Sequence, residues 1–284
     1  MPPFLIFTRM IKNSQPIGVF DSGYGGLTVL NELRKALPEY DFIYLGDNAR
    51  SPYGTRSFDV VYDYTLEAVE QLFSMGCELV ILACNTASAK ALRTIQQRDL
   101  PKINSNRRVL GVIRPSVEEV SKLTRSKHIG VMGTVGTIRS NSYPLEIAKL
   151  FPDVVVVQEA CPMWVPLVEN NEIDTDGGRY FIKQNIDNLL AKDPLIDSII
   201  LGCTHYPLMQ SEIREMLPDH IQLISQGEIV ARSLKDYLFR HPEMDVRCSK
   251  NSNCEFFTTE FVDSFEEKAS RFLNTSLKAQ HISY

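Results

Sequence analysis

The sequence lacks the long apolar runs of a membrane protein and the basic stretches of a nucleic-acid binder. None of its segments is apolar for the roughly 18 residues that a membrane span requires. The formal net charge is −5, and charges of both signs are spread along the chain, unlike the basic stripe that binds nucleic acid. We therefore expect a soluble globular protein without membrane or nucleic-acid partners.

Cysteine is too scarce for a disulfide scaffold, with six residues in a chain of 284. Free thiols predict the reducing cytoplasm as the compartment. Residues 1–15 have no clear signal-peptide pattern and are interpreted as an N-terminal extension. Cys248 and Cys254 bracket a polar stretch, and we interpret them as two loop thiols. A metal or redox pair is the alternative for these two residues.

Strand and helix patterns alternate along the chain, which predicts parallel sheets with helices on both faces. The expected strands cover 16–20, 41–45, 79–84, 109–113, 128–132, 154–157, 196–201, 221–224 and 255–258. The expected helices cover 27–37, 57–76, 87–97, 141–150, 175–191, 210–217, 228–239 and 262–273. We expect an α/β fold of two similar domains, residues 16–113 plus 225–284 and residues 114–224. The active site is expected in the cleft between them.

Two segments of this pattern have the same form, because each runs an apolar stretch into a cysteine. The first ends in Cys84-Asn85-Thr86 and the second in Cys203-Thr204-His205. Ends of buried parallel strands are where α/β proteins bind their ligands. A buried cysteine is often an inert packing residue, but both of these are followed at once by hydrogen-bonding side chains. The arrangement suits chemistry that needs one thiol on each face of a small substrate.

Two loops add polar groups to this picture. The glycine-rich loop 21–26 could bring backbone amides close to a ligand, but it lacks the Lys-Ser/Thr ending of a phosphate-binding loop. It begins with Asp21, which would repel phosphate and would suit an ammonium group or a base. The alternative is a turn that needs positive φ, with Asp21 as a helix cap. The loop 51–56 is either part of a site or a plain connection ending in an N-cap.

Other kinds of site remain open at this point. Two cysteines, a histidine and an aspartate could ligate zinc, but they lack the close ligand pairs of structural zinc sites, so we expect no metal. Cys203 with His205 could instead be the nucleophile and base of a cysteine amidohydrolase, which leaves Cys84 without a role. A cleft that only binds an acidic amino acid, or a protein whose main role is to bind another protein, is a third reading.

Five motifs, in their order along the chain, resemble the glutamate racemase family of the cofactor-independent aspartate/glutamate racemase superfamily. The resemblance covers nearly the whole chain from Ile17 onward. The motifs are Phe20-Asp21-Ser22-Gly23-Tyr24-Gly25-Gly26, Pro52-Tyr53-Gly54, Ala83-Cys84-Asn85-Thr86-Ala87, Ala160-Cys161-Pro162 with Pro166-Leu167-Val168-Glu169, and Gly202-Cys203-Thr204-His205-Tyr206-Pro207.

The resemblance implies a racemisation of glutamate by two cysteines, without a cofactor. It implies that Cys84 acts on D-glutamate with the help of Asp21, and that Cys203 acts on L-glutamate with the help of Glu169 and His205. It also implies a bacterial, homodimeric enzyme that supplies D-glutamate for the peptidoglycan of the cell wall. The positions that match substrate-binding residues are Asp21, Ser22, Tyr53, Gly54, Asn85, Thr86, Thr204 and His205, with Thr134 and Thr137 as weaker candidates.

Overall fold

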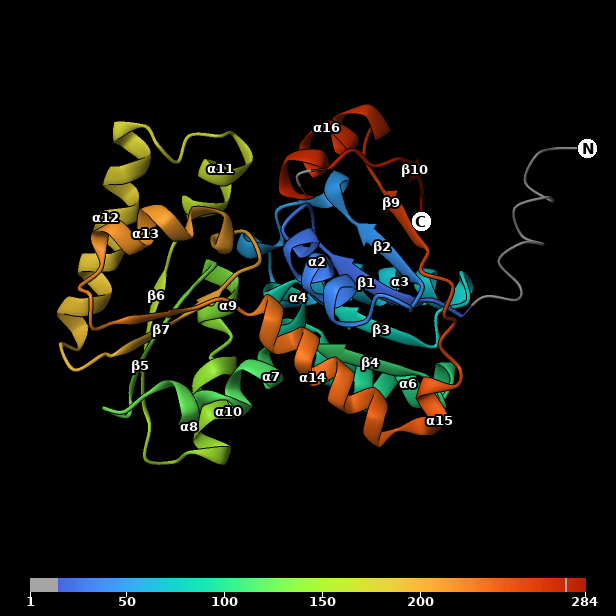
Figure 1. Cartoon of the computed structure of the whole chain (residues 1–284), viewed down its shortest axis with the longest axis horizontal. Coiled ribbons are helices and arrows are strands. Elements are labelled where there is room, and N and C mark those ends of the chain that lie inside the picture. Colours follow the sequence, from blue (N-terminus) through green and yellow to red (C-terminus); the bar gives the residue numbers. More distant parts are fainter. Residues whose placement is uncertain (1–14, 274) are drawn as a thin grey trace, which may run out of the picture.

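The computed structural model describes residues 15–273 and 275–284, and the predicted N-terminal extension falls almost wholly outside them. The described strands form two separate sheets, and every pair of neighbouring strands is parallel. The first sheet has the order β10-β9-β2-β1-β3-β4, and the second has the order β6-β5-β7-β8. Figure 1 shows the two sheets side by side, each with its own helices. The prediction of an α/β fold with two similar units is confirmed.

The first sheet is built from both ends of the chain. Its strands are β1 (Ile17–Asp21), β2 (Phe42–Gly46), β3 (Leu79–Leu82), β4 (Arg108–Gly111), β9 (Cys254–Thr258) and β10 (Ala279–His281). Its helices are α2 (Gly26–Ala36), α3 (Phe58–Ser74), α4 (Asn85–Lys90), α5 (Leu92–Thr94), α6 (Leu100–Ile103), α14 (Gly227–Arg240), α15 (Pro242–Asp245) and α16 (Val262–Leu273). Short turns of 3-10 helix are η2 (Asn48–Arg50) and η3 (Tyr53–Thr55), and η4 (Ile95–Asp99) is a π-helical turn.

Side chains alternate across the first sheet, so both of its faces are buried. On β1, Ile17 and Val19 join an apolar cluster with α2, α14 and α16, whereas Phe20 joins a second cluster with α3 and α4. Alternation of this kind is what the period of a strand imposes. Strands β1 and β3 lie side by side in the interior of the sheet, between the two layers of helices. Their carboxyl ends lead into the loops that follow Asp21 and Leu82.

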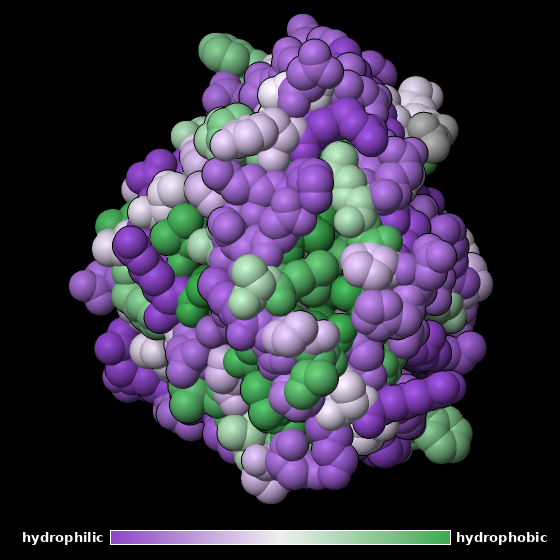
Figure 2. Space-filling model, turned by 90° about the vertical axis from the view of Figure 1, so that its left-hand side faces the viewer, coloured by the Kyte–Doolittle hydropathy of each residue, from purple (hydrophilic) through white to green (hydrophobic). Residues whose placement is uncertain are grey.

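The second sheet is continuous in sequence. Its strands are β5 (His128–Gly133), β6 (Val155–Ala160), β7 (Ser198–Gly202) and β8 (Gln222–Ile224). Its helices are α7 (Ile113–Glu118), α8 (Val120–Leu123), α9 (Val135–Arg139), α10 (Ser142–Leu150), α11 (Trp164–Glu169), α12 (Asp176–Lys192) and α13 (Gln210–Met216), with the 3-10 turn η5 (Tyr206–Met209). Figure 2 turns this side of the molecule to the viewer and shows hydrophobic residues gathered in the middle of a largely hydrophilic face.

The chain crosses between the two sheets twice. The first crossing follows β4, where α7 begins at Ile113, and the second follows β8, where Gln226 precedes α14. The two crossings lie together, because Gln226 Nε2 donates a hydrogen bond to the Val112 carbonyl over 3.2 Å. The predicted domain limits, 16–113 with 225–284 and 114–224, stay predictions, and they fall at these crossings.

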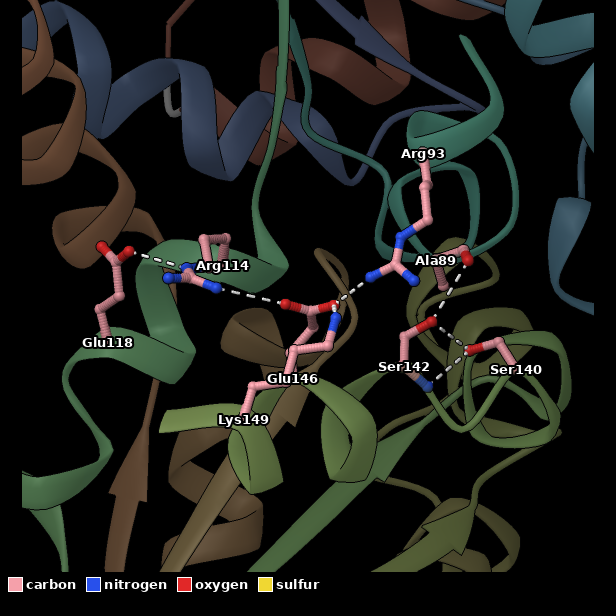
Figure 3. A network of polar contacts seen from close by, with 8 residues as sticks. All are labelled: Ala89, Arg93, Arg114, Glu118, Ser140, Ser142, Glu146 and Lys149. Carbon is pink, nitrogen blue, oxygen red and sulfur yellow. Dashed lines mark hydrogen bonds and ion pairs between the residues drawn. The ribbon is translucent and has the colours of Figure 1, made fainter. Parts of the chain in front are cut away.

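An ionic cluster also joins the two units, away from the cysteines. Glu146 of α10 accepts from Arg93 of α5 over 2.5 Å and from Lys149 over 2.5 Å, and it lies 3.3 Å from Arg114 of α7. Figure 3 shows this carboxylate between the three cations, with Ser142 donating to the Ala89 carbonyl nearby. The cluster therefore ties α10 to α5, which packs on the first sheet.

Several local predictions were wrong. The strand expected over 109–113 ends at Gly111, because the chain turns there into α7 and crosses to the second sheet. The single helix expected over 87–97 is broken into α4, α5 and a π-helical turn. The edge strand β10 was not expected, and Cys254 begins β9 instead of lying in a loop.

Within the described residues, no helix is long and apolar enough to cross a membrane.

Candidate active site

Cys84 lies at the junction of β3 and α4, where it is the N-cap residue of the helix. Its sulfur accepts from the backbone amide of Ala87 over 3.4 Å and lies 3.4 Å from Ser22 Oγ. A helix N-terminus favours negative charge on such a sulfur. Burial has the opposite and larger effect, and together with the nearby Asp21 carboxylate it raises the pKa of the Cys84 thiol to about 12. These surroundings favour the protonated thiol at Cys84.

Cys203 follows β7 directly and belongs to a chain of polar contacts. Its sulfur lies 3.9 Å from His205 Nδ1, and His205 Nε2 lies 2.9 Å from Glu169 Oε1 at the end of α11. Burial would lower the pKa of His205, but the contacts with Cys203 and Glu169 raise it to about 10. The imidazole is thus protonated at neutral pH and lies between a carboxylate and a thiol.

Asp21 ends β1 and is fully buried between the two cysteine segments. Its carboxylate accepts from the backbone amide of Gly23 over 2.9 Å and from the Thr204 hydroxyl over 3.3 Å. Burial raises the pKa of Asp21, although the nearby His205 has a lowering effect. A carboxyl group with a raised pKa exchanges a proton more readily with a neighbouring group near neutral pH.

Gly25 of the loop 21–26 lies where the two units approach each other closely. A Cβ on Gly25 would lie 2.3 Å from Thr204 Oγ1 and 2.4 Å from His205 Nδ1. The φ of Gly25 is −57°, and among the described glycines a positive φ occurs at Gly76 alone. The alternative of a turn that needs positive φ is therefore wrong for this loop. The lack of a side chain at Gly25 lets the loop pack against the segment that follows Cys203.

A small cavity of about 110 Å³ lies where these segments meet. Both Cys84 and Cys203 line it, one from each unit, and so does His205. The predicted substrate-binding residues that line it are Ser22, Tyr53, Gly54, Asn85, Thr86, Thr134, Thr204 and His205. Asp21, Glu169 and Thr137 stand behind the lining and contact it. A larger hollow of about 610 Å³ lies beside Glu146, but no cysteine lines it, so we assign the chemistry to the smaller one.

Hydroxyl groups join the two units at the rim of this cavity. Thr86 Oγ1 of α4 lies 2.9 Å from Thr134 Oγ1 and 3.3 Å from Thr137 Oγ1, both from the start of α9. Thr134 also caps α9, because its hydroxyl accepts from the Thr137 amide over 3.2 Å. Within residues 15–273 and 275–284, no lysine or arginine lines the cavity. A negative group bound there would have to be held by hydroxyls, amides and His205.

Tyr53 lines the cavity, but its hydroxyl serves the fold. It donates to the buried carboxylate of Asp47, which also pairs with Arg50. Gly54 follows in the same turn, and a Cβ on it would lie 2.8 Å from Thr134 Cβ. The loop 51–56 thus forms part of the cavity wall and packs closely against the second unit.

Some site residues were not found by sequence reasoning. Thr28 of α2 donates to the Thr204 carbonyl over 3.0 Å, and Tyr143 and Gln226 contact Asn85. These residues lie far from the motifs in sequence, and only their positions in space relate them to the site. Cys161 also lines the cavity, and burial raises its pKa well above the usual value. Among the residues that the structure describes, no group of three or more histidine, cysteine, aspartate or glutamate side chains could hold a metal ion.

Comparison with known proteins agrees with the motifs. The family model described as Asp/Glu/Hydantoin racemase matches residues 18–234. A glutamate racemase of Geobacter metallireducens is 40% identical over 262 residues, which are 92% of this chain and 93% of that protein. The chain therefore belongs to the Asp/Glu/Hydantoin racemase family and, within it, to the glutamate racemases.

Solved structures support the same assignment. A glutamate racemase isoform of Bacillus anthracis superposes with a TM-score of 0.86 at 38% identity, covering 95% of this chain and 97% of that one. A glutamate racemase of Francisella tularensis, solved in complex with D-glutamate, superposes with a TM-score of 0.84 at 32% identity, covering 95% and 98%. The resemblance inferred from the five motifs is confirmed, and so is the architecture of the fold.

Proposed function

We propose that this protein interconverts L-glutamate and D-glutamate without a cofactor, using Cys84 and Cys203 as opposed acid and base. The observation that supports this most directly is the convergence of both thiols on one cavity, each from the end of a strand in a different sheet. A racemase must remove a proton from one face of the α carbon and return one to the other face. Two thiols from two facing units meet this need.

In each direction one cysteine acts as a thiolate and the other as a thiol. The thiolate takes the α proton, the electron pair of the C–H bond stays on the α carbon, and the other thiol gives its proton to the opposite face. The two cysteines end with exchanged protonation states. Burial and the nearby Asp21 carboxylate raise the pKa of Cys84, which favours Cys84 as the thiol. With Cys84 as the thiol, Cys203 takes the proton from L-glutamate.

The carboxylates and the imidazole assist the thiols. We propose that Asp21 receives the proton of Cys84 when D-glutamate is the substrate. For Cys203 the corresponding path is a relay, in which His205 gives its Nε2 proton to Glu169 and takes the thiol proton at Nδ1, across the contacts of 2.9 Å and 3.9 Å. Their different environments imply that the two directions need not have equal turnover numbers.

Carbanion formation is the difficult step, because the α proton of an amino acid is far less acidic than a thiol with a pKa of about 8.5. Hydrogen-bond donors aimed at the α-carboxylate, where charge accumulates, lower this barrier. We propose that Ser22, Asn85, Thr86 and Thr204 supply these donors, with the first amides of α4. Tyr53 and Gly54 shape the wall of the site. Glutamate bound in this small cavity would displace water from it, which strengthens each contact.

We further propose a cytoplasmic homodimer that supplies D-glutamate for peptidoglycan. The six cysteines are all free, which suits a reducing compartment. Leu145, Val155 and Tyr180 are exposed apolar side chains on the second unit and offer surface for self-association. Light scattering coupled to size exclusion measures the mass, and a mass near that of one chain at micromolar concentration would exclude a stable dimer.

Circular dichroism of glutamate tests the activity. Purified protein, with no added cofactor, is expected to remove the optical rotation of either pure enantiomer. An unchanged signal from L-glutamate after prolonged incubation would refute the proposal.

A cysteine amidohydrolase is the second candidate, because Cys203, His205 and Glu169 are arranged as nucleophile, base and orienting group. That activity would release ammonia from glutamine-like substrates and would leave the α hydrogen in place. Uptake of deuterium at the α carbon in heavy water, without ammonia release, excludes it. The same uptake excludes a protein that only binds an acidic amino acid or another protein.

A further inference from the structure

Three buried side chains form a closed ring of hydrogen bonds behind the cavity. Asn85 Nδ2 donates to Gln226 Oε1 over 2.8 Å, Gln226 Nε2 donates to Tyr143 OH over 2.8 Å, and Tyr143 OH donates to Asn85 Oδ1 over 2.7 Å. The three residues come from the start of α4, the residue before α14, and α10. Only Asn85 among them lines the cavity.

The direction of the ring is fixed from outside it. Gln226 Nε2 also faces the Val112 carbonyl over 3.2 Å and Ser116 Oγ over 2.7 Å. A carbonyl can only accept, and the Ser116 hydroxyl donates its own hydrogen to Val112 over 3.2 Å. The nitrogen of the Gln226 amide, and not its oxygen, must therefore lie on this side.

This constraint passes to Asn85. Since Gln226 presents its oxygen to Asn85, the facing atom of Asn85 must be the nitrogen, because two amide oxygens would repel each other. Tyr143 supplies the matching donor for the Asn85 oxygen, and burial raises the pKa of Tyr143, so its hydroxyl keeps the proton. One amide hydrogen of Asn85 is used by Gln226, and the second is left for an acceptor in the cavity.

We propose that Gln226 is a positioning residue for the reaction, which acts through Asn85 by fixing its carboxamide with one hydrogen directed to a carboxylate oxygen of the substrate. This inference rests on the proposed function and names part of its binding apparatus. Val112 and Gln226 lie at the two crossings between the units, so the same ring ties the orientation of Asn85 to the place where the units join.

A double-mutant cycle tests the role. Gln226→Met keeps the length of the side chain but removes its donor and acceptor, and it leaves Asn85 free to rotate. We expect the KM for both glutamate enantiomers to rise about tenfold, the effect of losing one well-placed hydrogen bond to a charged group, with a smaller change in kcat. In an Asn85→Ala background the same substitution should change KM less than twofold. Tyr143→Phe is a second variant with the same expected effect.

The controls separate positioning from a structural role. Tyr40→Phe removes another buried tyrosine hydroxyl, which donates to Asp245 in the first unit, and should leave KM and kcat unchanged. Thermal melts of all variants report folding. A Gln226→Met protein that folds with an unchanged KM overturns the inference, and so does an equal change of KM with and without the Asn85 side chain.

Calorimetric titration with D-glutamate distinguishes a failure of this inference from a failure of the proposed function. Wild-type protein that binds glutamate without racemising it would refute the proposed function, and the ratios of Kd among the variants would then decide the role of Gln226. Wild-type protein that does not bind glutamate would overturn both.

Discussion

Replacement of Gly25 by alanine is expected to impair catalysis through the Cys203 side of the site. The added Cβ would lie 2.3 Å from Thr204 Oγ1 and 2.4 Å from His205 Nδ1, so the segment that carries these residues must move. Ordinary contact begins near 3.4 Å, which makes the required displacement about 1 Å. A misplacement of this size at a reacting group costs about 100-fold in rate, or about 2.7 kcal/mol of activation free energy.

The assay is the initial rate of change in circular dichroism with L-glutamate and with D-glutamate as substrates. We expect kcat/KM to fall about 100-fold in both directions, because an enzyme lowers one barrier for both. Overpacking should also reduce the free energy of unfolding by about 1–3 kcal/mol. The pH profile should change too, since His205 loses its position between Cys203 and Glu169.

Gly177→Ala is the matched control. Gly177 lies in the first turn of α12, and a Cβ there would meet one neighbour, Thr175 Oγ1, at 4.0 Å. Alanine at such a helix position is neutral or stabilises by up to about 1 kcal/mol, with wild-type activity. If Gly25→Ala kept the rate of the control, the close contact between the glycine loop and the Cys203 segment would not matter for catalysis.

Three further predictions concern stability. The pKa of His205 is raised from 6.5 to about 10, so its contribution to the free energy of unfolding is complete below pH 6.5 and is lost as the pH rises toward 10. In Glu169→Gln, the free energy of unfolding measured in urea should fall less steeply with pH across this window than in the wild type. Equal slopes would refute the coupling between His205 and Glu169. Trp164 is fully buried against Tyr206, with ring centroids 4.8 Å apart. Trp164→Ala should therefore reduce the free energy of unfolding by about 3–5 kcal/mol, followed by far-ultraviolet circular dichroism during denaturation. A loss below about 1 kcal/mol would contradict this packing. Glu146→Gln should reduce the free energy of unfolding by at most about 1 kcal/mol at low salt and by less at high salt, because the ionic cluster is partly exposed. A larger loss that salt does not reduce would show that the cluster stabilises the fold more than a surface ion pair does.

The sequence predicted the parts of the fold that depend on local pattern. Alternating apolar runs and amphipathic segments locate the strands and helices. The helix expected over 57–76 is α3, and Ser57 caps it with a hydroxyl that accepts from the Val60 amide. The strand-end positions of Cys84 and Cys203 also follow from this pattern. The short edge strand β10 escaped prediction, because three residues with little apolar character carry no periodic signal.

The crossings were harder to predict for a physical reason. Val109 to Ile113 is an apolar run, but the sheet uses it only to Gly111, and Ile113 is buried instead as the first residue of α7. An apolar residue reports burial and does not say which element buries it. The same holds for the helix expected after Cys84, where a regular apolar pattern predicts one helix and the chain forms α4, α5 and a π-helical turn.

The polar parts of the site show the same limit. The sequence pairs Cys203 with His205, two residues away, but cannot show that Asn85, Tyr143 and Gln226 meet in a ring. It offers Tyr53 as a binding residue, while the fold directs its hydroxyl to Asp47. It offers positive φ as one reason for the glycines of loop 21–26, and the structure gives steric approach across two units as the reason at Gly25. Contacts between distant segments decide these cases.

Incorporation of deuterium at the α carbon measures the central claim most directly. In heavy water, with L-glutamate and wild-type protein, early product D-glutamate should carry deuterium while the remaining L-glutamate carries none, because different thiols face the two sides. Cys84→Ala and Cys203→Ala should each abolish racemisation, and Cys161→Ala should keep much of it although Cys161 lines the same cavity. Equal deuterium in substrate and product, or wild-type turnover by Cys84→Ala, would contradict a mechanism in which two cysteines act on opposite faces of one carbon.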